Sequence, residues 1–345
     1  MEIDKSLFYP LTPFHLICST ILRNKLNYKF NVLILDSNLF DDILINQIKK
    51  TNKWNKIFIL TKSSNHFTIL HSTKYLNKIL PFFDNDIYNI YFFSPGINKC
   101  NLIINKLSHN NKLFLCDDGI APYYFNSSIL KFWQELTKKN KLKLYFLKFI
   151  NFFTNIDYQF NLNEEIKLIL MNKDLSSLII EKHLKINIEN VDKHLALNEL
   201  ANYYSYLIPE ITINYKIVFF HSEKFDFDKF VYSSLLKKYS DQEIFHCFRQ
   251  RTNNKYISLY QSHNNNVPWE ILHYLFLNNF KESILISSSF TTAFINTINP
   301  YIGNNKRIII NEDYIYKPAL FDKIINLLNK NSKKPICILK NINEL

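Results

Sequence analysis

Basic and hydroxyl side chains stand near the carboxyl ends of apolar runs, or directly after them, in the second half of the chain. They are His221, Ser222, His246, Arg249, Ser287, Ser288 and Ser289. The runs 216–220, 244–248 and 283–286 have the pattern of buried strands, and helical patterns separate them. Because ligands bind beyond the carboxyl ends of parallel strands, we expect these side chains to face one crevice. A base, a cation and a cradle of hydroxyls and amides suit an anionic ligand.

A few side chains of this crevice could take part in phosphate chemistry. His246 could donate a proton to a leaving phosphate, and Arg249 could hold the phosphate charge. The serines 287–289 lie between a strand and a helix, where hydroxyls and free helix amides bind phosphate. Two ordinary explanations compete with these roles. A histidine can be a satisfied polar residue, and an N-cap would need only one serine.

Carboxylates that could act as a base or bind sugar hydroxyls occur in both halves. Asp117, Asp118 and Gly119 follow an apolar run that ends at Cys116. This motif suits general-base chemistry and sugar binding, and equally an Asx turn that caps the next helix. Glu270 opens a helix, where it could accept ribose hydroxyls or complement the helix dipole.

Two Asp-x-Asp triplets have the pattern of metal-dependent sugar transferases, although so short a pattern also occurs by chance. Residues 84–86 have the character of a surface turn. Asp226 and Asp228 are better placed, just after the first crevice strand. The chain has no Walker loop, no dinucleotide glycine fingerprint, no nucleophile elbow and no zinc-protease motif.

The first half alternates strand and helix patterns. Strands are predicted at 6–9, 30–35, 56–61, 87–93 and 112–116, and helices at 14–27 and 39–50. Thr12 can cap the first helix, and Pro13 suits its first position. We therefore predict an α/β fold with one domain at 1–140, a helical connecting region at 141–210, and a second α/β domain at 211–345. A late helix is predicted at 320–330.

The segment 142–153 is dense in Phe, Leu, Ile and Lys, and two explanations stay open for it. It could be a core helix with solvated lysines. It could also be an interfacial helix that rests on anionic lipid, with its lysines at headgroup level.

The bulk composition bounds the class of protein. A chain of 345 residues fits two domains, and 47% hydrophobic with 21% charged residues is typical of a globular protein. The net charge of +12 favours acidic partners such as a phosphate-bearing substrate, an anionic membrane surface or nucleic acid. The five cysteines are scattered and suggest reduced thiols. With no signal-peptide pattern and no apolar run of ~18 residues, we expect a cytoplasmic protein.

Taken together, the motifs resemble those of the bacterial sialyltransferases of lipooligosaccharide and capsule synthesis, glycosyltransferase family 52, and more distantly the polysialyltransferases. The matching segments, in the family's order, are Leu11-Thr-Pro-Phe-His15-Leu, Asp117-Asp-Gly119, His246, Arg249-Gln250, Val267-Pro-Trp-Glu270 and Ser287-Ser-Ser289. Cys247 replaces the proline that follows the family's histidine. The family's general-base Asp corresponds, without gaps, to Lys224. The base then falls to a neighbour, Asp226 first and Glu223 next, with the pair at 117–118 as the alternative.

The resemblance implies a GT-B fold, in which two Rossmann-like domains enclose the active site in the interdomain cleft. Domain 1–140 would receive the acceptor, and domain 211–345 would bind the donor, CMP-sialic acid. Sialic acid would pass in one inverting displacement to a galactose-type hydroxyl of a surface glycan, with no metal and no cofactor.

The resemblance also implies roles for particular residues. Asp226, His246 and Asp118 would be catalytic. The substrate-binding residues would be Asp117, Gly119, Ser222, Arg249, Glu270, Ser287, Ser288 and Ser289. The charge of +12 suits an anionic donor and a lipid-linked acceptor at the inner face of the cytoplasmic membrane. The resemblance is also compatible with a homodimer.

Other functions fit the same sequence. A GT-B transferase that uses a different nucleotide sugar, such as a UDP-hexose, would share the fold and the crevice. A nucleic-acid-binding protein would account for the charge and the 16% aromatic residues. The lysines are spread along the chain and no recognition module is present, so we expect no nucleic-acid partner. An inactive transferase is a third alternative, because Cys247 interrupts a motif.

Overall fold

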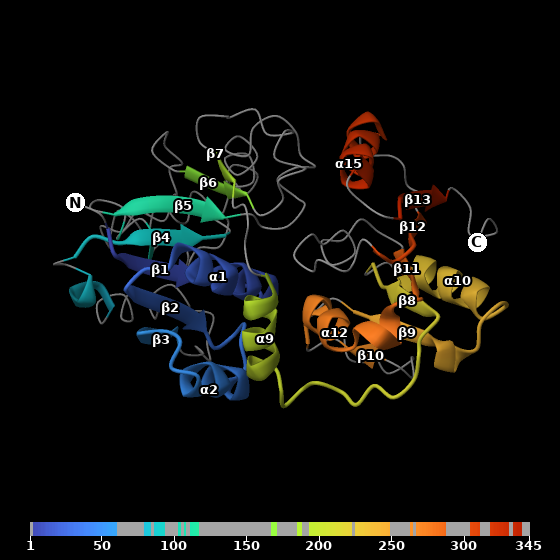
Figure 1. Cartoon of the computed structure of the whole chain (residues 1–345), viewed down its shortest axis with the longest axis horizontal. Helices are drawn as coiled ribbons and strands as arrows, with labels where there is room; N and C mark the ends of the chain where they lie inside the picture. The colour runs from blue at the N-terminus through green and yellow to red at the C-terminus, as the bar shows by residue number, and fades with distance from the viewer. Residues whose placement is uncertain are drawn as a thin grey trace, which may run out of the picture. The chain divides into compact units, whose positions relative to one another are not determined.

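The structure is a computed structural model of the 345-residue chain. It describes residues 3–60, 79–83, 86–93, 103–104, 107, 111–116, 167–170, 185–187, 193–222, 225–248, 263–264, 267–287, 304–310, 318–330 and 334–339. The chain divides into two compact units, Met1–Asp192 and Lys193–Leu345 (Figure 1). Each unit is built on its own parallel sheet.

Seven strands form the sheet of the first unit in the described residues. They are β1 (Lys5–Tyr9), β2 (Phe30–Asp36), β3 (Lys56–Leu60), β4 (Asn89–Phe92), β5 (Lys112–Cys116), β6 (Lys167–Leu170) and β7 (Lys185–Asn187). Their order is β3-β2-β1-β4-β5-β6-β7, and each neighbouring pair is parallel. The strand order reverses between β1 and β4, which makes the carboxyl ends of these two strands the topological switch point. The predicted strands of the first half are confirmed.

Local sequence signals set the helices of this unit. They are α1 (Pro13–Leu26), α2 (Asp42–Lys50) and the short 3₁₀ turn η1 (Leu80–Phe82). Thr12 Oγ1 accepts a hydrogen bond from the His15 N–H at 3.2 Å, and Pro13 takes the first helical position. Asp41 caps α2 in the same way, accepting from the Leu44 N–H at 2.7 Å. The predicted cap at Thr12 is confirmed.

Aromatic stacking across neighbouring strands fills the core of the first sheet. The rings of Phe8 and Tyr91 stack with centroids 4.8 Å apart, and Tyr91 stacks on Phe114 at the same distance. Trp54 packs edge-on against Phe8 at 5.5 Å. At the amino end of the strands, Ser6 Oγ donates to Asn31 Oδ1 at 2.7 Å, which joins β1 to β2 through neutral groups.

The predicted helical connection at 141–210 is wrong in part. β6 and β7 lie inside this range and extend the first sheet, with Cys116 of β5 in register with Ile169 of β6. The charge of the segment favoured helix, whereas the four-residue run Lys167–Leu170 pairs as a strand between β5 and β7. The second unit begins at Lys193, not near 211.

Six strands form the sheet of the second unit in the described residues. They are β8 (Ile217–Phe220), β9 (Ile244–Cys247), β10 (His263–Asn264), β11 (Ile284–Ser287), β12 (Arg307–Ile310) and β13 (Ile336–Leu339). The helical elements are α9 (Lys193–Tyr203), α10 (Phe225–Leu235), η4 (Asp241–Glu243), α12 (Trp269–Leu275), α13 (Leu277–Phe280) and α15 (Pro318–Lys330). The order β10-β9-β8-β11-β12-β13 is that of a Rossmann sheet, with its switch point between β8 and β11.

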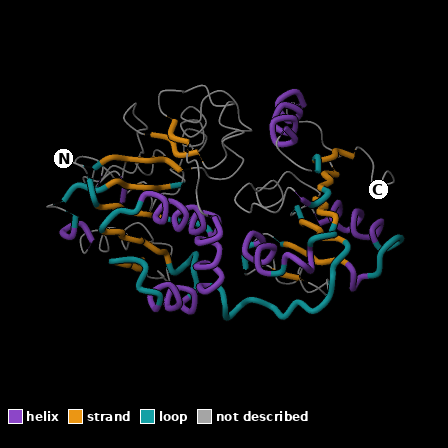
Figure 2. Tube along the Cα trace, in the orientation of Figure 1, coloured by secondary structure: helices purple, strands orange, loops and turns teal. Residues whose placement is uncertain are grey.

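Alternate residues of β8 and β9 face opposite sides of this sheet. Ile217, Phe219 and Ile244 pack with Val231 and Leu235 of α10. On the other side Phe220 and Phe245 pack against Trp269 of α12, with ring centroids 5.4 and 6.3 Å away. Figure 1 shows α10 and α12 on opposite sides of the strands, and Figure 2 shows the strands as one layer between helices. A polar residue at the end of β8 or β9 therefore belongs to one of two faces.

The predicted fold class, α/β with two Rossmann-like domains, is confirmed by the strand orders of the two sheets. In the part of the chain that the structure describes, no helix is long and apolar enough to cross a membrane.

Candidate functional site

His221 occupies the first position beyond β8, at the switch point of the second sheet. Its backbone N–H donates to the carbonyl of Cys247 at 2.9 Å, which continues the pairing of β8 with β9 by one residue. Its ring lies between Phe219 and Phe248, with centroids 4.3 and 4.2 Å away. His221 is 2% exposed, so the packing of two aromatic rings fixes this imidazole in place.

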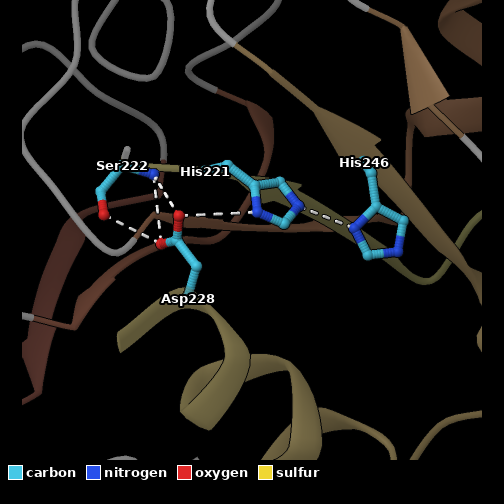
Figure 3. A network of polar contacts seen from close by, with 4 residues as sticks. All are labelled: His221, Ser222, Asp228 and His246. Carbon is cyan, nitrogen blue, oxygen red and sulfur yellow. Dashed lines mark hydrogen bonds and ion pairs between the residues drawn. The ribbon is translucent and has the colours of Figure 1, made fainter. Parts of the chain in front are cut away.

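The imidazoles of His221 and His246 contact each other directly. His221 Nε2 and His246 Nδ1 are 2.9 Å apart, so one nitrogen donates a proton and the other accepts it. Both rings lie on the α10 side of the sheet, because Phe219 and Tyr232 contact the His246 ring. The sequence predicted that side chains at the ends of β8 and β9 converge, and these two do so (Figure 3).

Asp228, in the first turns of α10, connects this histidine pair to Ser222. Its carboxylate accepts hydrogen bonds from the Ser222 N–H at 2.9 and 3.1 Å and from Ser222 Oγ at 2.9 Å. Its Oδ2 lies 3.6 Å from His221 Nδ1, which is too long for a hydrogen bond but close enough for attraction. Figure 3 shows the His221 ring between Asp228 and His246. Asp228 is fully buried, so these contacts compensate its desolvation.

The charge of this group follows from burial. Burial lowers the pKa of His221, and the nearby Asp228 carboxylate opposes that shift only in part. His221 is therefore neutral at neutral pH. Ser222 directs its hydroxyl proton at Asp228, so Oγ can only accept a hydrogen bond from any further partner. A hydroxyl or amino group of a ligand suits this position better than a phosphate oxygen does.

Asp241 stands at the other end of the histidine pair. Its Oδ1 lies 3.9 Å from His246 Nε2, and the Tyr232 hydroxyl donates a short hydrogen bond to the same oxygen. The Asp241 side chain is 21% exposed, whereas the His246 side chain is fully buried. The group thus runs from a buried carboxylate, through two imidazoles, to a carboxylate near the surface.

Glu270 and Cys247 lie on the opposite face of the sheet. Burial raises the pKa of the Cys247 thiol far above its usual value, and the nearby charge of Glu270 adds to the shift. Glu270 is 4% exposed and follows Trp269, which packs against Phe220. Glu270 therefore lies on the other face of the sheet from the histidine pair, and its predicted contact with a ribose stays a prediction.

Ser287 is the member of the predicted serine triplet 287–289 that the structure describes. It ends β11, is fully buried, and stands in parallel register with Phe220 of β8. His221 and Ser222 follow Phe220 directly, so the carboxyl ends of β8 and β11 place these groups on neighbouring strands. Asp226 lies in the first turn of α10 and is exposed, apart from the Asp228 contacts.

Several predicted site residues lie outside the described residues. They are Asp117, Asp118, Gly119, Glu223, Arg249, Ser288 and Ser289. The segment 142–153 lies outside them as well. In the part of the chain that the structure describes, no group of three or more His, Cys, Asp and Glu side chains is placed to hold a metal ion.

Asp228 and Asp241 are the site residues that sequence reasoning undervalued. Asp228 lies three and seven residues before Val231 and Leu235, so all three share the buried face of α10. That helical spacing was available in the sequence and favours Asp228 over Asp226 as the inward carboxylate. Asp241 lies outside any strand pattern, and no spacing rule would have joined it to His246.

No protein-family model matches the sequence, and no curated protein matches it significantly. Among solved structures, the chain is similar to the spinosyn forosaminyltransferase SpnP, with a TM-score of 0.48, 9% identity, and coverage of 98% of this chain and 86% of that chain. It is also similar to the N-terminal domain of trehalose-6-phosphate phosphatase from Candida albicans, with a TM-score of 0.40 and 10% identity over 95% of this chain and 89% of that one. A family 9 glycosyl transferase from Veillonella parvula DSM 2008 gives a TM-score of 0.36 and 11% identity over 98% of this chain and 88% of that one.

Proposed function

We propose that the chain is an inverting glycosyltransferase of the GT-B kind. It would transfer sialic acid from CMP-sialic acid to a galactose-type hydroxyl of a bacterial surface glycan, in lipooligosaccharide or capsule. The observation that carries the proposal is the switch point of the second sheet, where His221 and Ser222 follow β8 and Ser287 ends the neighbouring strand β11. A Rossmann sheet of this order binds nucleotides there.

The parts of the proposed site suit the chemistry of this transfer. The acceptor O–H bond breaks as its oxygen bonds to the anomeric carbon, and the bond from that carbon to the CMP phosphate oxygen breaks with its electron pair leaving on CMP. A carboxylate takes the proton, and Asp226, exposed at the start of α10, is the proposed base. Ser287 would stabilise the charge on CMP, together with Ser288, Ser289 and Arg249, which follow the strands in sequence. Sialic acid carries its own carboxylate beside the oxocarbenium ion.

Nucleotide binding tests the proposal directly. The full chain would be heated with CMP, CDP, UMP, UDP or GDP, with and without magnesium, because a ligand that binds only the folded state raises Tm by mass action. We expect a rise with CMP that does not depend on magnesium, followed by sialic acid transfer from CMP-sialic acid. A rise with UDP or GDP would retain a nucleotide-sugar transferase and discard the donor. No rise with any nucleotide, together with salt-sensitive binding to DNA, would contradict the proposal.

Ser287, which ends β11, and Ser283, which directly precedes it, provide a matched pair of variants. Ser287→Ala changes the carboxyl end of the strand, and we expect it to lose the CMP-induced rise. Ser283→Ala changes the amino end, where Ser283 Oγ donates to the Tyr215 carbonyl at 2.5 Å. It should lower the Tm of the free protein and keep the rise. Contact with the inner membrane face and a homodimer stay predictions.

A further inference from the structure

The His246 imidazole is enclosed by side chains of this chain. It is fully buried, its Nδ1 contacts His221, and its Nε2 lies 3.9 Å from Asp241 Oδ1. In the described residues, the titratable groups that face the histidine pair are Asp228 and Tyr232 from α10 and Asp241 from η4. A group that protonates a leaving phosphate must point a nitrogen at it, and both nitrogens of His246 are directed into the protein.

The position of the protons follows from the partners. If His221 donated from Nε2 to His246, a neutral His221 would turn an unprotonated Nδ1 towards the Asp228 oxygen 3.6 Å away. Two acceptors would then face each other, which is unfavourable in a buried site. If His246 donates from Nδ1, the proton of His221 lies on Nδ1 and faces Asp228. In this second arrangement the two facing acceptors are His246 Nε2 and Asp241 Oδ1 instead, at the longer distance of 3.9 Å. That contact costs less, because the Asp241 side chain is 21% exposed and its Oδ1 accepts from the Tyr232 hydroxyl, whereas Asp228 is fully buried. The second arrangement is therefore the favoured one.

We propose that His246 is a positioning residue that acts through its Nδ1–H on His221, and not the acid that protonates the leaving phosphate. His246 fixes the tautomer and ring position of His221. His221 in turn faces Asp228 with an N–H, so Asp228 stays an acceptor for the Ser222 N–H and hydroxyl. The pair thereby orients Ser222 at the switch point. The effect on turnover rests on the proposed function, whereas the tautomer of His221 does not.

Two amide substitutions separate the two nitrogens of His246. The Asn side-chain amide nitrogen lies near the position of Nδ1, and the Gln amide nitrogen near that of Nε2. His246→Asn keeps a donor for His221, and His246→Gln removes it. We expect turnover with CMP-sialic acid and a galactose-terminated acceptor to stay within about threefold for His246→Asn, and to fall about tenfold or more for His246→Gln, the size of one hydrogen bond.

His273 supplies the control from the opposite face of the same sheet. It is fully buried, and its Nε2 bonds to Asn305 Oδ1 at 3.0 Å. Asn305 donates through Nδ2 to the carbonyls of Phe280 and Ser283, so its Oδ1 is the acceptor and His273 Nε2 the donor. The preference must therefore reverse: His273→Gln should keep a higher Tm than His273→Asn. If the fold simply tolerated one amide side chain better than the other, the same variant, Asn or Gln, would be favoured at both positions.

The measured pattern decides between positioning and direct chemistry. General acid catalysis contributes about 100-fold or more, so if both His246 variants lost that much turnover, His246 would be the acid and the proposal would be overturned. Equal, unchanged turnover in both variants would also overturn it.

The tautomer can be measured even in a protein without turnover. In 15N-histidine-labelled full chain, protonated and unprotonated ring nitrogens resonate in separate ranges. We expect His221 to be protonated at Nδ1 in the wild type and in His246→Asn, and to lose this preference in His246→Gln. A proton on His221 Nε2 in the wild type would overturn the proposal. Absence of transfer with the expected tautomer would overturn only the proposed sialyltransferase function.

Discussion

The sheets of the two units share the order 3-2-1-4-5-6, which the first sheet extends by a seventh strand, but polar groups at the carboxyl ends of their strands are bonded differently. In the described residues of the first unit, two buried polar groups at these ends bond to near neighbours in sequence. His15 Nδ1 accepts from the Leu11 N–H at 3.2 Å, and Asp36 Oδ1 accepts from the N–H and the amide of Asn38 at 2.9 and 2.8 Å. In the second unit, the contact between His221 and His246 spans two strands, and Asp228 and Asp241 continue it at either end.

The two cases differ in whether a buried polar group bonds to residues close to it in sequence or to residues on other strands and helices. A buried carboxylate in a turn such as that of Asp36 shapes the backbone and needs little from the rest of the fold. A buried chain of ionisable groups costs more desolvation, because each member depends on the others for its hydrogen bonds. A Rossmann sheet binds its ligands at the carboxyl ends of its strands, and in this chain the buried chain of ionisable groups lies at those ends of the second sheet. We therefore assign the site to the second unit.

Removal of Asp228 should have the largest effect on stability. Asp228→Ala leaves a buried N–H and hydroxyl of Ser222 without their acceptor and removes the charge that faces His221. We expect the free energy of unfolding of the second unit to fall by about 3 kcal/mol. Local hydrogen exchange of the β8 and α10 amides, measured by mass spectrometry, reports this unit separately from the first.

The matched control for Asp228 is Asp36 in the first unit. Asp36→Ala removes a local turn contact, and we expect a loss of about 1 kcal/mol, confined to β2 and its turn. Equal losses at the two positions would remove the distinction between the units. A smaller loss at Asp228 than at Asp36 would show that the histidine chain is not held by its carboxylate.

The sequence predicted the strands of both sheets well wherever an apolar run stood between turn residues. β1 to β5, β8, β9 and β11 all follow from such runs. It did not place β6 and β7, because strands of four and three residues are too short to give a clear pattern within a charged segment. It also did not show that Glu270 and the histidine pair lie on opposite faces of the sheet. Spacing along the chain predicts which end of a strand a residue occupies. The face of the sheet on which its side chain lies depends on how α10 and α12 pack against the strands.

Acid should destabilise the second unit first. Because burial lowers the pKa of His221 in the folded state, the unfolded chain binds more protons once the pH falls below its ordinary value of about 6.5. The stability linked to His221 is thus fully present above about pH 6.5 and falls as the pH decreases from there. Hydrogen exchange at pH 7.5 and 5.5 should show a larger loss of protection in β8 and β9 than in β1 and β2.

The variant His221→Gln tests whether this residue causes the pH dependence. It cannot be protonated, so the loss of protection between pH 7.5 and 5.5 should shrink in β8 and β9, even though the variant is less stable at both values. An undiminished pH dependence in His221→Gln would assign the effect to another group, and the buried pair would no longer distinguish the two units.

The smallest effect should come from the charged pair at the amino end of the same two strands. Lys216 and Glu243 form an ion pair just before β8 and β9, and the Lys216 side chain is mostly exposed. The Lys216 charge and the Ser240 N–H lower the pKa of Glu243 to about 2, so the linked stability is present above its unfolded value and is lost only as the pH falls towards about 2. Water and salt screen such a pair. Lys216→Met should therefore change the urea midpoint of the second unit less than either Asp36→Ala or Asp228→Ala, and 1 M salt should abolish the change. A loss in Lys216→Met that resists salt and is as large as that of Asp228→Ala would contradict this. Exposed charge at the amino ends of the strands would then stabilise the sheet as much as the buried group at the carboxyl ends. The assignment of the site to the carboxyl ends would lose its energetic support.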